Sequence, residues 1–112
     1  MNNQDIETIQ VPMEQVQAEI KLGELLEELH KNRAFKKLIL EDYFKVEAEN
    51  LVAVLGSPMS DMQRTSIINK MTGISMLRAH FNGVMRKADS ARLALLEHNE
   101  VLAERMAAEQ GA

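Results

Sequence analysis

Apolar residues recur at three- and four-residue steps along most of the chain, which is the spacing of one face of an α-helix. In the first segment this face alternates with glutamates and consists of Val16, Ile20, Leu22, Leu25, Leu26 and Leu29. Pro12 suits the first turn of a helix, because proline has no N–H group to leave unsatisfied there. The spacing therefore predicts a first helix over about 12–31, after a polar, flexible leader at 1–11.

A second helix is predicted over about 33–55. Asn32 precedes it as a candidate N-cap, because an asparagine side chain accepts a hydrogen bond from a free backbone N–H. Gly56 and the Ser57-Pro58 pair end it, since proline cannot continue a helix. Its apolar residues cover more than one stripe, so we expect this helix to be the central one. The short link between the two helices favours an antiparallel hairpin.

Helical spacing continues through the rest of the chain, with Ser60 and Gln63 as a candidate capping box at its start. A seven-residue repeat of apolar positions runs from about Ile74 to Leu102. The apolar stripe that it forms on the helix is wide up to Met85 and narrow after it. An unbroken helix over the whole third segment, which has about 50 residues, measures about 75 Å, whereas each of the first two helices measures about 30 Å. The C-terminal half, about 88–109, therefore carries apolar residues that the chain's own hairpin does not easily bury.

We expect an all-α fold, in which an antiparallel helical hairpin packs on a long third helix with a coiled-coil-like C-terminal half. The domain organisation is then a flexible leader at 1–11, a helical domain at 12–87 and a C-terminal helical arm at 88–112. The narrow seam on the arm predicts a partner-binding site, which consists of Ala88, Ala91, Leu95, His98 and Leu102. In an alternative, the third helix breaks at Gly73 or near Asp89 and folds back to give a compact four-helix monomer.

The amino-acid composition restricts the possible chemistry of the protein more than it restricts the possible folds. The chain has 112 residues, no cysteine and a formal net charge of -4, which predicts one small domain and excludes a disulfide scaffold, a thiolate metal site and a cysteine nucleophile. We find no membrane-spanning run and no secretory signal. His30, His80 and His98 each lack a second ligand at helical spacing, so we expect no metal and no cofactor. No catalytic motif is present, and we expect no enzyme.

The charges are distributed unevenly. Between residues 56 and 87 the only acidic residue is Asp61, whereas both ends of the chain are acidic. Arg64, Arg78 and Arg86 fall within about 80° of one another around a helix and form a candidate anion-binding strip. Their spacing is too sparse for a continuous phosphate track, and no aromatic residues lie between them for base stacking. The strip is therefore more typical of a solvated face than of a nucleic-acid site.

Several stretches of the sequence resemble a known group of proteins. They are Leu22–Leu26, Asn32–Lys45, Glu47-Ala48, Leu51-Val52 and Ile74–Arg78, together with Phe81. These stretches resemble small helical proteins of tailed bacteriophages, which are often encoded near head and packaging genes. The resemblance covers about residues 16–105. It implies a phage origin and a minor virion or head-assembly role, in the virion or the host cytoplasm, and it supplies no functional residues.

Together these features predict a non-enzymatic interaction protein that self-associates through its C-terminal helix or binds another phage virion protein. A homo-oligomer is the expected form, with no membrane partner. The alternative is a small phage regulator, which inhibits a host or phage enzyme or binds nucleic acid through the arginine strip.

Overall fold

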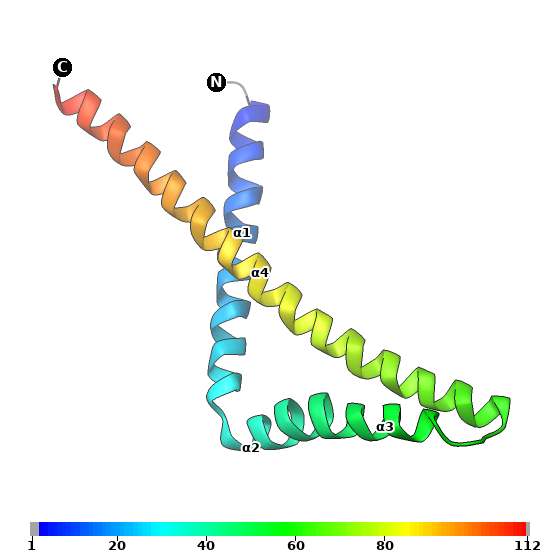
Figure 1. The fold of residues 1–112 in the computed structure, drawn as a ribbon. Helices are drawn as coiled ribbons and strands as arrows, with labels where there is room; N and C mark the ends of the chain where they lie inside the picture. The colour runs from blue at the N-terminus through cyan, green and yellow to red at the C-terminus, as the bar shows by residue number, and fades with distance from the viewer. Residues whose placement is uncertain (1–2, 112) are drawn as a thin grey trace. The chain divides into compact units, whose positions relative to one another are not determined.

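The computed structural model describes residues 3–111 of the chain, and of residues 3–12 it describes only the helical backbone. Within this part the fold is all-α and contains no strand (Figure 1). The helices are α1 (Asn3–Lys31), α2 (Arg33–Phe35), η1 (Lys36–Glu47), α3 (Ala48–Leu55) and α4 (Asp61–Gly111). The predicted all-α class and the long C-terminal helix are therefore confirmed.

The first helix, α1, begins at Asn3 and thus earlier than the start near residue 12 that the sequence suggests. The helix continues through Pro12, where one backbone hydrogen bond is lost because proline has no N–H group. A proline that suits the first turn of a helix therefore does not by itself fix where the helix starts. The flexible leader predicted at 1–11 lies outside the residues whose side chains are described, and its flexibility stays a prediction.

Both predicted helix caps are confirmed. Asn32 has extended backbone angles, and its side chain accepts a hydrogen bond from the backbone N–H of Phe35 at 3.0 Å. Before α4, the backbone N–H of Gln63 donates to Ser60 Oγ at 3.2 Å, and the backbone N–H of Ser60 donates to Gln63 Oε1 at 3.0 Å. This reciprocal pair is a capping box, which satisfies two backbone donors that the helix itself leaves free.

The backbone between Arg33 and Leu55 is helical throughout, but its hydrogen bonding changes along the way. η1 is a π-helix of 12 residues, in which each bond spans five residues and the turn is wider than in an α-helix. Residues four or five apart therefore share a face, as Ile39, Phe44 and Ala48 do where they contribute to the core. An interpretation of the sequence with α-helical spacing alone does not predict this change. As predicted, the helix ends before Gly56.

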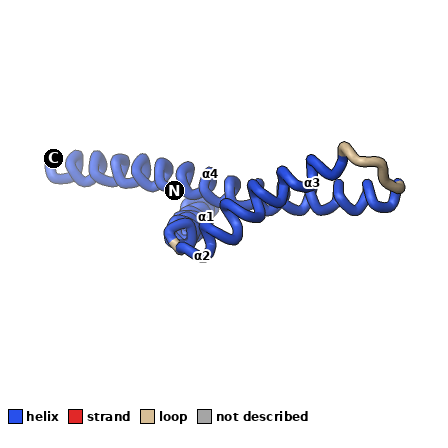
Figure 2. Tube along the Cα trace, turned by 60° about the horizontal axis from the view of Figure 1, so that its bottom comes forward, coloured by secondary structure: helices blue, strands red, loops and turns tan. Residues whose placement is uncertain are grey.

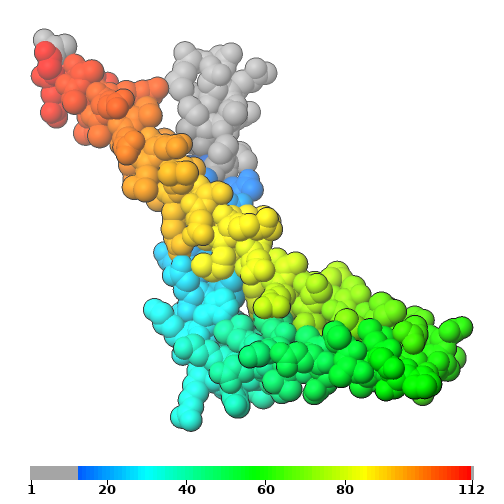
Figure 3. Space-filling view, in the orientation of Figure 1, coloured from blue at the N-terminus to red at the C-terminus, as the bar shows by residue number. Residues whose placement is uncertain are grey.

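Residues 26–83 form one of two compact units, which we name the 26–83 unit. In it, η1 and α3 lie beside the first part of α4, and Figures 1 and 2 show the two segments running side by side. Their core contains the buried residues Phe44, Leu51 and Ile74. Partly buried residues surround them: Ile39, Leu40, Tyr43, Ala48, Ile67, Met71, Leu77 and Phe81. In Figure 3 side chains fill the space between the two segments.

Phe81 is the centre of an aromatic cluster in the 26–83 unit. Its ring centroid lies 5.8 Å from that of Phe35 and 6.0 Å from that of Phe44. The His30 ring lies 6.4 Å from Phe81 with the two planes at 78°, which is an edge-to-face arrangement that aromatic pairs prefer. The cluster connects the end of α1, α2, η1 and α4 within this unit.

Two expectations about the later helices are wrong. The helix over 33–55 is not central, because Leu38, Val46 and Val52 are 62%, 45% and 56% exposed. Within the 26–83 unit, the core forms on only one of its sides. The alternative with a broken third helix is also wrong, since α4 runs without a break past both Gly73 and Asp89.

Candidate interaction surfaces

The other compact unit, the terminal unit, consists of α1 up to Leu25 and α4 from Val84 onward. Ala88 and Ala91, the first two residues of the predicted seam, are buried in it, at 0% and 2% exposure. Gly23 of α1 faces Ala88 so closely that a Cβ atom on Gly23 would overlap the Ala88 Cβ atom. The buried start of the seam therefore contacts the chain's own first helix.

Charged groups flank this contact. The ideal Cβ position of Gly23 lies 3.7 Å from Arg92 Nη2, so the Arg92 side chain lies beside the helix crossing. Its Nη1 group donates to Asp89 Oδ1 at 3.2 Å, three residues earlier on the same helix. A partly exposed pair of this kind contributes little to stability. The close contact of small residues, rather than this ion pair, defines the crossing.

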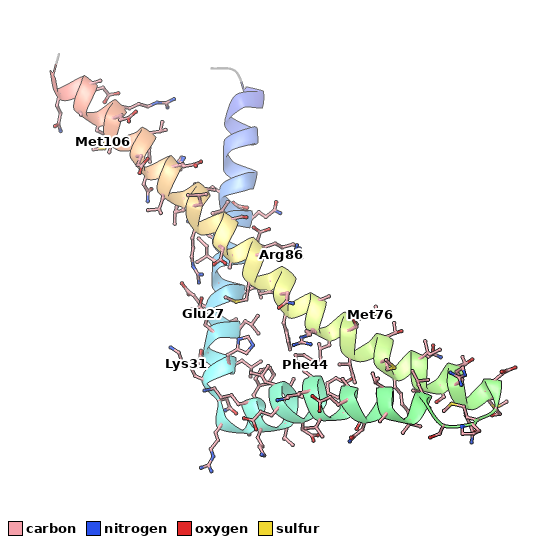
Figure 4. All side chains as sticks on the ribbon, viewed as in Figure 1. Glu27, Lys31, Phe44, Met76, Arg86 and Met106 are labelled. Carbon is pink, nitrogen blue, oxygen red and sulfur yellow. The ribbon has the colours of Figure 1, made fainter. Side chains whose placement is uncertain are left out.

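Further along the predicted seam, burial decreases. Leu95 and His98 are half-buried, and from Asn99 to Gly111 every residue is exposed. Leu102 is 43% exposed, and Met106 is 59% exposed on the C-terminal part of α4 (Figure 4). These two residues lie four positions apart and thus share one side of the helix. Of the five predicted contact residues, Leu102 is the most exposed, Leu95 and His98 are half-buried, and Ala88 and Ala91 are buried.

The three arginines of the candidate anion-binding strip, Arg64, Arg78 and Arg86, are all exposed on α4. Arg64 and Arg78 belong to the 26–83 unit, and Arg86 belongs to the terminal unit. The Arg78 guanidinium carbon lies 5.9 Å from the centroid of the Phe44 ring, which is within the range of a cation–π contact. Arg78 therefore has an interaction inside its own unit that does not require an anionic ligand.

A hollow of about 370 Å³ lies in the 26–83 unit, where the loop after α3 leads into α4. Its lining consists of Val54, Ser57, Pro58, Met59, Gln63, Ser66, Ile67 and Lys70. The lining contains no histidine or carboxylate that would activate a serine as a nucleophile. The hollow is thus a surface depression with one cationic side chain, not an arrangement for acid–base chemistry.

Among the described residues, no three His, Asp or Glu side chains lie close enough together to bind a metal ion. In the same part of the chain, none of the helices combines the length and the apolar character that a membrane crossing needs. Comparison of the chain with protein-family models, with curated proteins and with solved structures found no match.

One surface was not singled out by the apolar pattern. α4 has an exposed side within the 26–83 unit that includes Met62 and Met76, at 84% and 68% exposure. In the sequence this side is marked by the absence of charged residues and not by an apolar stripe. No Asp, Glu, Lys or Arg occupies it between residues 62 and 83. Hydrophobic spacing alone does not reveal such a surface.

Proposed function

We propose that the protein is a non-enzymatic interaction protein that associates with further copies of itself through the C-terminal part of α4. The observation that carries the proposal is the exposure of Leu102, at the end of a seam whose beginning, at Ala88, is buried; Met106, four residues after Leu102, is exposed as well. The same repeat thus continues from a covered part of the helix to an uncovered one. Apolar seams with this spacing are typical of helices that pair.

The burial of Ala88 and Ala91 within the chain supports a contact that uses fewer residues than the five of the predicted seam. These two alanines are occupied within the chain, so a second copy has Leu95, His98 and Leu102 within reach, with Met106 as a further contact. The antiparallel packing of the first two helices and the coiled-coil form of the C-terminal half stay predictions. They belong to this proposal as its finer details.

We further propose a minor virion or head-assembly role in a tailed bacteriophage, in the virion or the host cytoplasm. Support for this part comes from the resemblance of residues 16–105 to small helical phage proteins. An interaction protein without a catalytic arrangement is compatible with such a role. The partner is then a second copy of the chain or another virion protein.

Two experiments test the two parts of the proposal separately. Sedimentation of the full chain over a range of concentrations is expected to give an average mass that rises above the 12.7 kDa of one chain. Mass spectrometry of purified phage particles is expected to detect the chain. A constant monomer mass would contradict self-association, and absence from the particles would contradict the virion role.

A further inference from the structure

The contact of Gly23 with Ala88 sets how α1 and α4 run against each other in the terminal unit. α1 is the only other helix in this unit. Beyond Ala88, Leu95 is half-buried, whereas Leu93 and Leu96, on other sides of the same helix, are 58% and 60% exposed. Within the unit, the cover on Leu95 therefore comes from the part of α1 that precedes Gly23. The two helices are thus antiparallel here.

From this contact the register continues in steps of seven residues, in opposite directions along the two helices. Val16 lies seven residues before Gly23, and Leu95 lies seven residues after Ala88; both are half-buried. Residues seven apart share one side of a helix that pairs with another. The other residues on these two sides are also buried or half-buried: Met13, Ile20, Ala91 and His98.

The 26–83 unit, taken by itself, contains a contact at the same spacing. His30 lies seven residues after Gly23 in the sequence, and Phe81 lies seven residues before Ala88. The ring centroids of His30 and Phe81 are 6.4 Å apart. A second contact between α1 and α4 therefore supports the same register.

The next step of seven leads to Ile9 on α1 and to Leu102 on α4. Leu102 is 43% exposed, and of residues 3–12 the structure describes only the helical backbone. In the sequence, Ile6 and Ile9 continue the three- and four-residue steps of Met13 and Val16, whereas the residues directly next to the two isoleucines are polar. This spacing assigns Ile6 and Ile9 to the side of α1 that pairs with α4.

The helical backbone of residues 3–12 needs support from a neighbour. Pro12 removes one backbone hydrogen bond within α1, and a helical segment of about ten residues is only marginally stable in water by itself. Helices in proteins gain most of their stability by packing an apolar side on another element. Proline also permits a bend, which allows the segment before Pro12 to incline toward α4. The exposed seam at Leu102 is the apolar surface that the register places beside it.

We propose that the N-terminal part of α1 covers the C-terminal seam of its own chain, with Ile9 against Leu102 and Ile6 between Leu102 and Met106. A second copy then binds Leu102 only after this segment has left the seam. The competition rests on the self-association proposed above, whereas the covering itself does not. The seam thus has two occupants that exclude each other, and its availability is regulated from within the chain.

The connection of this segment to the rest of α1 favours it over a second copy as the first occupant. The contact of Gly23 with Ala88 already holds α1 against α4, so the covering extends an existing contact. A segment tethered in this way has an effective concentration of about millimolar at its site. A second copy at micromolar concentration therefore competes at a disadvantage.

The lack of cysteine in the chain makes double-cysteine variants of the full chain a direct test of the covering. Ile9→Cys/Leu102→Cys is expected to form a disulfide within one chain under mild oxidation, at a concentration at which sedimentation gives the mass of a monomer. Thr8→Cys/Leu102→Cys is the matched control, because Thr8 lies about 100° around the helix from Ile9. Ile9→Cys/Leu95→Cys tests the register, since Leu95 lies about 10 Å from Leu102 along α4, beyond the reach of a disulfide.

The pattern of disulfides decides whether α1 covers the seam. A link within one chain for Ile9/Leu102, with little for the other two pairs, supports the contact and its register. Equal linking of Thr8/Leu102 and Ile9/Leu102 overturns the contact, because a segment that collides at random links both. Preferred linking of Ile9/Leu95 overturns the register. Links formed only between chains, or no link at all, overturn the covering within the chain.

The competition is tested by the dissociation constant of the full chain, measured by sedimentation over a range of concentrations. Ile6→Lys/Ile9→Lys is expected to lower the dissociation constant by about tenfold, because a larger fraction of the chains then has an open seam. Thr8→Lys/Gln10→Lys adds the same two charges off the pairing side of α1. This control is expected to leave the dissociation constant nearly unchanged.

Failure of the competition and failure of self-association give different results. A dissociation constant that Ile6→Lys/Ile9→Lys leaves unchanged overturns the competition. One that this variant raises also overturns it, because the segment would then contribute to the contact between copies. If the native chain and both variants stay monomeric at all concentrations, the proposed self-association is wrong, and the disulfide test alone decides the covering.

Discussion

Gly23 of α1 and Ala88 of α4 approach each other so closely that no side chain fits between them. A Cβ atom added to Gly23 would overlap that of Ala88, and Ala88 has no exposed surface. The two smallest side-chain types thus set the distance between these helices in the terminal unit. This contact removes the first part of the apolar seam on α4, at Ala88, from solvent, whereas the end of the seam, at Leu102, stays exposed.

Gly23→Ala is expected to destabilise the protein by about 1–3 kcal/mol, because the added methyl group overpacks the contact with Ala88. The measurement is urea-induced unfolding followed by circular dichroism. Gly73→Ala is the matched control, since a Cβ atom there meets nothing closer than 3.9 Å. The control is expected to keep or raise the free energy of unfolding of the monomer. Equal stability of the two variants would contradict the close contact at Gly23.

The helix caps give a second prediction. Asn32→Ala and Ser60→Ala should each lower the free energy of unfolding by about 1 kcal/mol, because each removes a hydrogen bond to a free backbone N–H. Asn32→Asp and Ser60→Thr should restore most of the loss, since both replacements retain a side-chain acceptor. Ser57→Ala serves as the control in the same loop as Ser60. Alanine variants as stable as the native chain would show that the caps contribute nothing.

The different burial of two isoleucines on α4 predicts that replacing them by alanine lowers the stability by different amounts. Ile74 is 4% exposed and Ile68 is 47% exposed. Ile74→Ala should cost about 2–5 kcal/mol, because it leaves a cavity in the core beside Phe44 and Leu51. Ile68→Ala should change stability by less than about 0.5 kcal/mol in the monomer. If Ile68→Ala costs as much as Ile74→Ala at low concentration, the assigned sides of the helix are wrong.

The contact of Arg78 with the Phe44 ring predicts a difference between two exposed arginines. Arg78→Gln should lower the free energy of unfolding by about 0.5–1 kcal/mol through loss of the cation–π contact. Arg64→Gln removes the same charge from α4 without that ring contact and should have a smaller effect. Thermal unfolding of the two variants at equal concentration measures the difference. A larger effect of Arg64→Gln would contradict a structural role for Arg78.

Local features of this fold could be predicted from sequence because they depend on residues close together in the chain. Asn32, Ser60 and Gln63 form caps through hydrogen bonds that span three residues, and proline and glycine after Leu55 end a helix for local reasons. The length of α4 follows likewise from helical spacing without a strong break. Gly73 alone does not interrupt it, because one glycine weakens a helix without ending it.

Features that depend on other parts of the chain could not be predicted in the same way. Apolar spacing shows that Ala88 and Leu102 share a side of α4, but not that Gly23 covers Ala88 while Leu102 stays exposed. The π-helical bonding of η1 changes which residues share a face, and α-helical spacing cannot detect it. Hydrophobic spacing likewise overlooks a surface around Met76 that is defined by the absence of charge.

The most direct test of the proposed self-association compares two double variants of the full chain by sedimentation. Leu102→Lys/Met106→Lys places charges on the exposed part of the seam, and Ala103→Lys/Ala107→Lys adds the same charges on another side of the same exposed segment. The C-terminal contact predicts that the Leu102/Met106 variant has a lower average mass than the Ala103/Ala107 variant at equal concentration, because a buried unpaired charge weakens the interface. Identical average masses for the two variants and the native chain would contradict it.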